Sequence, residues 1–152
     1  MPVTPTVNGQ IIGQAHYATR AVLERLLATT GTTFHQSVAL NAIADSGEAI
    51  ERGRLVDRMT GTLKIDAEAA EATVAELSAA GLLEEVPGST VRVALTPAGR
   101  DRRQANSAGI ADITARLYAG LPAEDLAATG RVLTEVTARA NAVLAGACEP
   151  VG

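Results

Sequence analysis

One stretch in the middle of the chain constrains its fold more than any other feature. Residues 54–65 predict a short helix and a turn, and residues 66–80 predict a second helix that a glycine closes. Residues 82–85 and 91–95 flank a Pro-Gly-Ser turn, which predicts a β-hairpin. Helix, turn, helix and hairpin, in this order, form a winged helix-turn-helix, a fold that normally reads DNA through its second helix.

The charge of the second helix opposes this expectation. No basic residue lies between Lys64 and Arg92. Six acidic residues lie between them, namely Asp66, Glu68, Glu71, Glu76, Glu84 and Glu85. Carboxylates without a cationic neighbour are repelled by DNA phosphates. The order of the elements therefore predicts DNA binding, whereas the charge of the reading element argues against it.

Size and composition limit the remaining choices. At 152 residues, the chain can hold one medium domain, or one small domain with dimerisation arms. Hydrophobic residues make up 47% of the chain and charged residues 20%, as in folded proteins. The formal net charge of −4 means that the whole molecule does not attract polyanions. Any contact with nucleic acid must therefore be a local basic patch.

The sequence lacks the motifs of common enzyme and metal sites. It has no Gly-x-Ser-x-Gly, phosphate loop, His-Glu-x-x-His or dinucleotide fingerprint, so we expect no enzymatic activity and no cofactor. His16 and His35 lack further ligands at metal-binding spacing, so we expect no metal site. The single Cys148 excludes a disulfide framework. Without a signal peptide or an 18-residue apolar run, the chain is expected to be cytoplasmic and without a membrane partner.

Helical patterns flank the winged region on both sides. Residues 10–30 and 100–147 predict helices, whereas residues 1–9 predict a flexible arm and residues 148–152 a tail. These helices carry apolar stripes that include Ile110, Ile113, Leu117, Leu133, Val136 and Leu144. A small winged domain cannot cover so much apolar surface, so we expect a homodimer, with a monomeric helical bundle as the alternative.

Local signals also mark where three of the helices begin. Thr33 and Gln36 have the spacing of a capping box, which predicts the start of a helix over residues 34–44. Thr96 followed by a proline predicts the start of a helix that runs to about Gly120. Pro122 predicts the start of the last helix.

Three segments of the chain resemble the MarR family of bacterial transcription regulators. They are residues 54–56 (RLV), residues 79–84 (AAGLLE) and residues 93–100 (VALTPAGR). Together with the order of elements, the resemblance extends from about Gln10 to Ala147. The last of the three segments, the exit from the hairpin, is its most specific part.

The resemblance implies a mainly α fold with a small β-hairpin wing. Residues 10–147 would be a single MarR-like chain, with a winged helix-turn-helix at residues 33–99 between N- and C-terminal dimerisation helices. It further implies a homodimer on a double-stranded DNA operator, with residues 66–80 in the major groove and the wing at the minor groove. A small aromatic or phenolic effector, or oxidation of a cysteine, would release the DNA.

Few residues of the expected reading helix suit DNA. The positions that the resemblance places against bases and phosphates fall on Glu68, Ala69 and Ala72, none of which is a strong hydrogen-bond donor. Glu68 or Glu71 would accept a hydrogen bond from the amino group of a cytosine. The wing tip, residues 86–90, is short and uncharged, whereas wings of the family usually carry basic residues.

Contacts with phosphates are instead expected from the residues around this helix. Arg54, Lys64 and Arg92 all flank it in the expected fold. The alternative is that the basic residues of this region are solvated surface charges. Their acidic partners would then be Glu51, Asp57 and Asp101.

The resemblance also places an effector cavity where the first, second and fifth helices meet. Its expected lining residues are His16, Tyr17, Arg20, Phe34 and His35. Arg20 would hold a carboxylate, and the aromatic side chains would stack on a ring. The alternative is that these are ordinary capping or interface residues. Redox sensing has little support, because the single cysteine lies in the expected tail without a second cysteine nearby.

Together these patterns predict a dimeric MarR-like transcription regulator that binds a pseudo-palindromic operator and responds to a small aromatic ligand. The alternative is a degenerate winged-helix dimer that does not bind DNA and acts as a ligand-binding or protein-interaction module. The acidic helix at residues 66–80 is the feature that separates the two.

Overall fold

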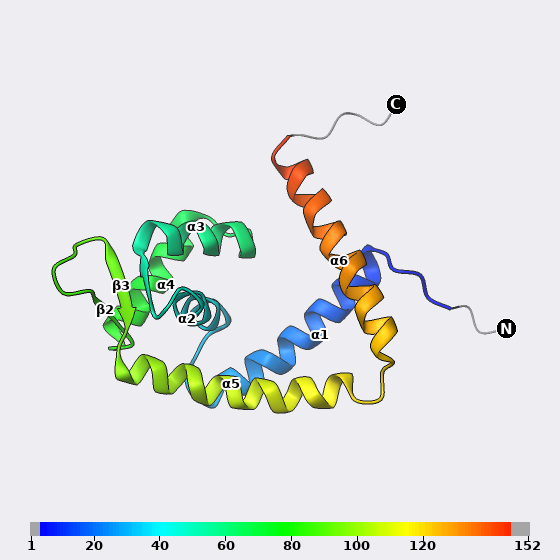
Figure 1. The fold of residues 1–152 in the computed structure, drawn as a ribbon, viewed down its shortest axis with the longest axis horizontal. Helices are drawn as coiled ribbons and strands as arrows, with labels where there is room; N and C mark the ends of the chain where they lie inside the picture. The colour runs from blue at the N-terminus through cyan, green and yellow to red at the C-terminus, as the bar shows by residue number, and fades with distance from the viewer. Residues whose placement is uncertain (1–3, 147–152) are drawn as a thin grey trace. The chain divides into compact units, whose positions relative to one another are not determined.

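The structure, a computed structural model, describes residues 4–146 and contains helices and short strands in the expected order (Figure 1). Cys148 and the tail at residues 148–152 lie outside the described residues. The elements are α1 (Gly9–Ala28), α2 (Phe34–Asp45), β1 (Ala49–Glu51), α3 (Arg52–Leu63), α4 (Ala67–Ala79), β2 (Leu83–Glu85), β3 (Arg92–Leu95), α5 (Pro97–Tyr118) and α6 (Ala123–Leu144). The predicted mainly α fold with a hairpin wing is confirmed.

Side-chain caps fix where several helices begin. At the start of α2, the Thr33 hydroxyl accepts from the backbone N–H of Gln36, and the Gln36 amide oxygen accepts from that of Thr33, both at 3.1 Å. The predicted capping box is therefore confirmed. The Asp66 carboxylate caps α4, accepting from the N–H of Ala69 at 2.8 Å. Thr96 caps α5 in the same way, at 3.0 Å from the N–H three residues on.

The sheet has a third strand that the sequence patterns did not predict. β3 lies between β1 and β2 and pairs antiparallel with both, with Ile50 opposite Val93 and Leu83 opposite Leu95. β1 has only three residues, which is too short for an alternating pattern to stand out. Because β1 leads directly into α3, that helix begins at Arg52, two residues earlier than expected.

One hydrophobic core holds the winged region together. α2, α3 and α4 pack against one another, and the three-stranded sheet closes one side (Figure 1). The largest fully buried side chains of this region are Leu40, Ile43, Leu55, Met59, Val74, Leu77 and Leu95. Burying a side chain of this size contributes about 1.5–3 kcal/mol to the free energy of folding. This core therefore stabilises the winged region.

The chain divides into two compact units, with the break inside α5, between Ile113 and Thr114. Most of α5 therefore belongs to the first unit, together with α1 and the winged region. In the first unit, the Asn106 side chain is buried and forms hydrogen bonds with the hydroxyl groups of Thr30 and Thr32. This network fixes α5 against the α1–α2 connection.

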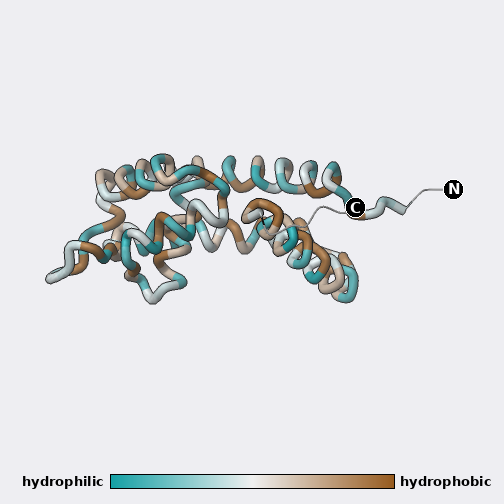
Figure 2. Tube along the Cα trace, turned by 90° about the horizontal axis from the view of Figure 1, so that it is seen from above, coloured by the Kyte–Doolittle hydropathy of each residue, from teal (hydrophilic) through white to brown (hydrophobic). Residues whose placement is uncertain are grey.

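The described part of the second unit buries no side chain. Large apolar residues are exposed along the end of α5 and along α6, including Leu117, Leu126, Leu133, Val136, Val143 and Leu144. Figure 2 shows hydrophobic residues recurring at intervals along the helices, between hydrophilic ones. No helix among the described residues is both long enough and apolar enough to span a membrane.

Gly99 tests the packing of α5 against the wing. A Cβ at this position would overlap the carbonyl oxygen of Leu82, which accepts the N–H of Thr96 at 3.1 Å. Gly99→Ala is expected to lower the free energy of unfolding by roughly 1–3 kcal/mol in urea denaturation, because backbone must shift to relieve the overlap.

Gly61→Ala is the matched control. Gly61 also lies in a helix, but nothing stands within 4 Å of the added Cβ. This variant is expected to gain about 0.5–1 kcal/mol from the higher helix propensity of alanine. Equal stability of the Gly99→Ala protein and the wild type would contradict the packing described here.

Candidate nucleic-acid interface

The turn between α3 and α4 sets the direction of the expected reading helix. Lys64 ends α3 in the left-handed conformation, with φ 58° and ψ 35°. Its ammonium group donates to the carbonyl oxygen of Gly61, so the side chain folds back along the end of α3. Lys64 remains exposed at the turn beside α4.

The structure brings Arg54 and Arg92 together. Arg54 lies on α3 and Arg92 on β3, and both line one pocket of about 310 Å³ whose wall also includes Ser46 and Glu51. Both arginine side chains are exposed, and within residues 4–146 neither forms an ion pair. Guanidinium groups suit the geometry of a phosphate group, so this pair is a candidate contact for the DNA backbone.

Other arginines of this region are paired, but not with the acidic residues that the sequence suggested. Arg52 lies 3.4 Å from Glu71, and Arg100 lies 3.5 Å from Glu48. Arg58 contacts Asp45 at 3.3 Å. These ion pairs hold neighbouring elements together. Their arginines thus have a structural role, whereas Arg54 and Arg92 have no acidic partner among the described residues.

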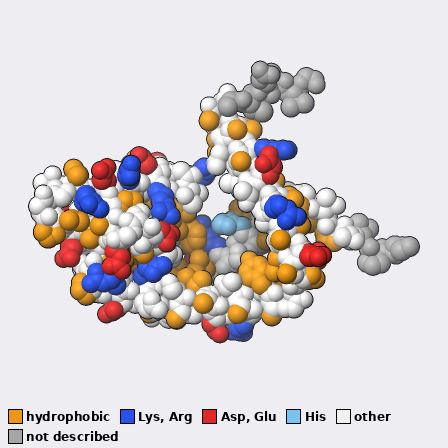
Figure 3. Space-filling view, in the orientation of Figure 1, with side chains coloured by type: hydrophobic (Ala, Val, Ile, Leu, Met, Phe, Trp, Pro, Cys, Tyr) orange, Lys and Arg blue, Asp and Glu red, His pale blue; other side chains and the backbone are white. Residues whose placement is uncertain are grey.

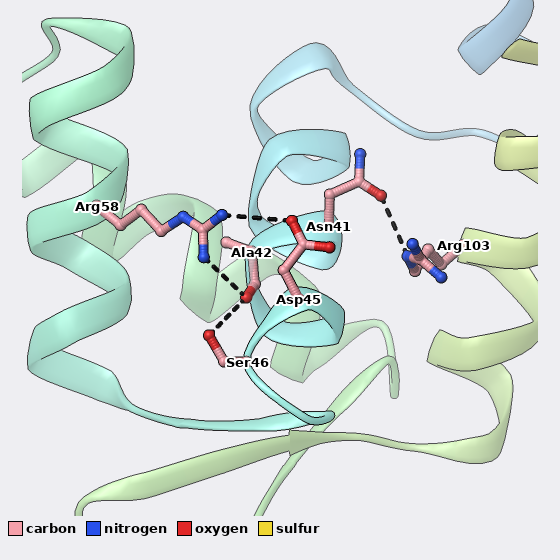
Figure 4. Close-up of polar contacts among 6 residues, drawn as sticks. All are labelled: Asn41, Ala42, Asp45, Ser46, Arg58 and Arg103. Carbon is pink, nitrogen blue, oxygen red and sulfur yellow. Dashed lines mark hydrogen bonds and ion pairs between the residues drawn. The ribbon is translucent and has the colours of Figure 1, made fainter.

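Polar contacts at the end of α2 show this structural role most clearly. Figure 4 shows the Arg58 guanidinium of α3 donating both to the Asp45 carboxylate and to the carbonyl oxygen of Ala42. Arg103 of α5 donates to the Asn41 side chain at 3.2 Å. Both arginines thus anchor their own helices to α2.

The exposed side of α4 is acidic, but part of its charge is engaged within the protein. Glu71 pairs with Arg52, as described above, and Glu76 accepts from the side-chain amide of Gln36 at 3.1 Å. Glu68 is exposed in the first turn of the helix. Figure 3 shows basic and acidic side chains intermixed over the winged region in that view, rather than a large patch of one sign.

The wing tip is held by contacts between a serine side chain and the backbone that follows it. The Ser89 hydroxyl accepts from the backbone N–H groups of Val91 and Arg92, at 3.3 and 3.2 Å. Gly88 adopts a positive φ of 81°, which the turn requires. No residue of the tip, residues 86–90, carries a charge, so Arg92 at the start of β3 is the cation nearest to it in the sequence.

Three of the five expected effector residues line a second pocket, of about 350 Å³. These are Arg20 of α1 and Phe34 and His35 of α2. Two residues expected to face DNA, Ala69 and Ala72 of α4, line the same pocket. The pocket therefore lies among α1, α2 and α4, and the lining residues include none from the described α5, where the resemblance had placed the cavity.

The other two expected effector residues lie outside this pocket. His16 and Tyr17 are exposed on α1, with Tyr17 at 73% exposure and the two rings 5.5 Å apart.

Inside the second pocket, Arg20 is already engaged. Its guanidinium carbon lies 4.3 Å from the centroid of the Phe34 ring, and its Nε donates to Glu24 at 3.2 Å. The i,i+4 spacing of Arg20 and Glu24 is visible in the sequence and predicts this pair. The contact between Gln36 and Glu76 spans forty residues and has no such local signal.

Comparisons with known proteins agree on the fold. No family model matches the chain, and no curated protein matches it. Among solved structures, a MarR family transcriptional regulator from Streptomyces coelicolor has a TM-score of 0.72 and 17% identity, over 86% of this chain and 91% of that one. A MarR mutant from E. coli complexed with operator DNA has a TM-score of 0.69 and 22% identity, over 84% and 91%.

A third structure shows the same fold with a small molecule bound. It is an organohalide-sensing transcriptional regulator in its 2,4-dichlorophenol-bound form, with a TM-score of 0.73 and 13% identity over 87% of this chain and 78% of that one. The chain is thus a winged helix-turn-helix protein. More narrowly, it has the fold of the MarR family of transcriptional regulators.

The cap of α4 gives a test of how the expected reading helix is positioned. Asp66→Ala removes the acceptor for the N–H of Ala69 and is expected to cost about 1 kcal/mol of stability. Asp66→Asn keeps an acceptor in place and should stay close to the wild type in the same urea titration. If Asp66→Ala is no less stable than Asp66→Asn, the carboxylate does not cap this helix.

Proposed function

We propose that this chain is a DNA-binding transcription regulator of the MarR type, which acts in the cytoplasm as a homodimer on a pseudo-palindromic operator. The observation that carries this proposal is the pair of exposed arginines, Arg54 on α3 and Arg92 on β3, in one pocket. Phosphate contacts fix the register of a protein on DNA, and guanidinium groups form them well.

Exposed apolar surface supports the dimer. α6 has no buried residue, and its apolar side chains continue the exposed row that begins near the end of α5. Apolar area left in water on this scale favours association with a second copy. A dimer also suits the operator, because two half-sites give an affinity that one half-site rarely reaches.

A small aromatic ligand in the α1–α2–α4 pocket is the proposed effector. Ala69, Ala72, Thr73 and Glu76 all belong to α4 and line this pocket. A ligand that binds there more tightly in one position of α4 than in another would shift that helix, and with it the affinity for DNA.

The acidic charge of α4 supports a second candidate function. A winged-helix dimer that has lost DNA binding would serve as a ligand-binding or protein-interaction module. Glu68 is exposed on the expected reading helix, where it would approach phosphates. Measurement of DNA binding separates the two functions.

Binding to the DNA upstream of its own gene, followed across a salt series, tests the regulator proposal. With about three phosphates neutralised per subunit by Arg54, Lys64 and Arg92, the log–log slope of affinity against salt is expected near −5 for the dimer. Arg92→Ala and Arg54→Ala should each reduce that slope by about 2, because a dimer loses two phosphate contacts. Both should weaken binding to all sequences alike.

Arg131→Ala is the control for net charge. Arg131 is exposed on α6, which belongs to the second unit, whereas α3 and α4 belong to the first. It should leave the slope unchanged. Glu68→Ala should change the sequence preference or raise the general affinity. No binding to this DNA by wild type at low salt, together with no recovery in Glu68→Ala, would establish the module function instead.

Charge placed on the exposed apolar row tests the dimer. Val136→Glu and Leu117→Glu would each bury an unpaired carboxylate at the proposed interface and are expected to give monomers or aggregates in sedimentation. Ala138→Glu introduces the same charge two residues along α6, about 200° around the helix, and should remain dimeric. A wild-type protein that sediments as a monomer at micromolar concentration would overturn the proposal.

A further inference from the structure

The pocket among α1, α2 and α4 holds more negative than positive charge. Its ionised side chains are Arg20, Glu24 and Glu76, one cation against two carboxylates. We infer that this pocket selects a flat organic cation, such as an amidinium or guanidinium carried on one ring, and not an aromatic acid. This inference deepens the effector part of the proposed function and rests on it.

Arg20 cannot act as a free anchor for a carboxylate. Glu24 accepts its Nε at 3.2 Å, and the guanidinium covers one face of the Phe34 ring at 4.3 Å. The two charges of this pair largely cancel for a ligand, since they lie in direct contact. An aromatic acid would have to share Arg20 with Glu24, which stays half-exposed beside it.

Glu76 supplies the charge that remains. Its carboxylate accepts from the Gln36 side chain, an uncharged amide, and no lysine or arginine of the described residues pairs with it. Its second oxygen is available to a ligand, because a carboxylate accepts several hydrogen bonds. An amidinium donates two N–H groups in one plane, which suits such a carboxylate.

The rest of the wall suits a single ring. Ala69, Ala72 and Thr73 of α4 present small side chains, and His35 adds an aromatic one. The volume of about 350 Å³ lies at the lower end of the range for small-molecule sites. The pocket therefore combines small side chains of α4 with the carboxylate of Glu76.

Three probes of almost the same shape and different charge test the inference. Benzamidine is a cation, benzamide is neutral and benzoate is an anion. Titration calorimetry with the purified full chain at pH 8, where benzamidine is a cation and benzoate an anion, gives their affinities. We expect benzamidine to bind about tenfold more tightly than benzamide, because one partly screened charge contact contributes a difference of about that size. Benzoate should bind most weakly.

Two variants and a control assign the charge preference to its residues. Glu76→Gln keeps the shape and should remove the tenfold preference for benzamidine over benzamide. Glu24→Gln releases Arg20 and should strengthen benzoate binding. Glu84→Gln on β2 makes the same change of net charge at an exposed residue outside the pocket, and should leave all three affinities unchanged. Amide chemical-shift changes at Ala72 and Thr73 on addition of benzamidine would place the probe against α4.

Each outcome decides the inference. Tightest binding of benzamidine with loss of the preference in Glu76→Gln supports it. Equal affinities, tighter binding of benzoate, no binding of any probe, or an unchanged preference in Glu76→Gln overturns it. DNA binding is measured separately. A protein that binds DNA but shows no preference for benzamidine overturns only this inference, and one that binds benzamidine through Glu76 but never DNA overturns the regulator proposal.

Discussion

The burial of one side of α4 is the constraint on which the rest of the winged region depends. Ala70, Val74 and Leu77 are fully buried, at positions i, i+4 and i+7 of the helix. This row packs α4 against α2 and α3. It thereby fixes which side chains of α4 face outward. Glu68 and Glu71 are exposed as a consequence of the packing of the core.

The same constraint determines where cations can lie. α4 itself contributes none, so the basic groups near it come from other elements, such as Arg20 of α1 and Arg52 of α3. Ion pairs such as Arg52–Glu71 are about half exposed and contribute roughly 0–1 kcal/mol each to stability. Their larger effect is on the field around α4, because Arg52 neutralises one of its carboxylates. Among the described residues, Arg54 and Arg92 have no such acidic partner.

Local signals account for what the sequence predicted correctly. The capping box at Thr33, the Thr96 cap and the helix at residues 66–80 each depend on residues within a few positions of one another. β1 escaped prediction because its three residues are a strand only through pairing with β3, more than forty residues later in the chain.

The expected site residues show the same division between local and long-range information. Arg54 and Arg92 were candidates from their expected position beside the reading helix, whereas their place in one pocket depends on the sheet that brings β3 beside β1. The pocket at Arg20 involves α4 because α2 and α4 pack together, as the Gln36–Glu76 contact shows. Nothing in the spacing of these residues along the chain indicates that arrangement.

α4 therefore carries two surfaces that cannot change independently. One side lines the α1–α2–α4 pocket through Ala69, Ala72 and Glu76, and Glu68 and Glu71 lie exposed on the same short helix. A helix moves as a rigid rod, so a shift that alters the pocket also alters the exposed side. By linkage, a ligand that changes the affinity for DNA through α4 must have its own affinity changed by DNA in the same ratio. The size of that ratio depends on how firmly the buried row of α4 holds its position. A rigidly packed helix transmits little of the effect of a ligand, whereas a helix with two packed positions transmits much of it.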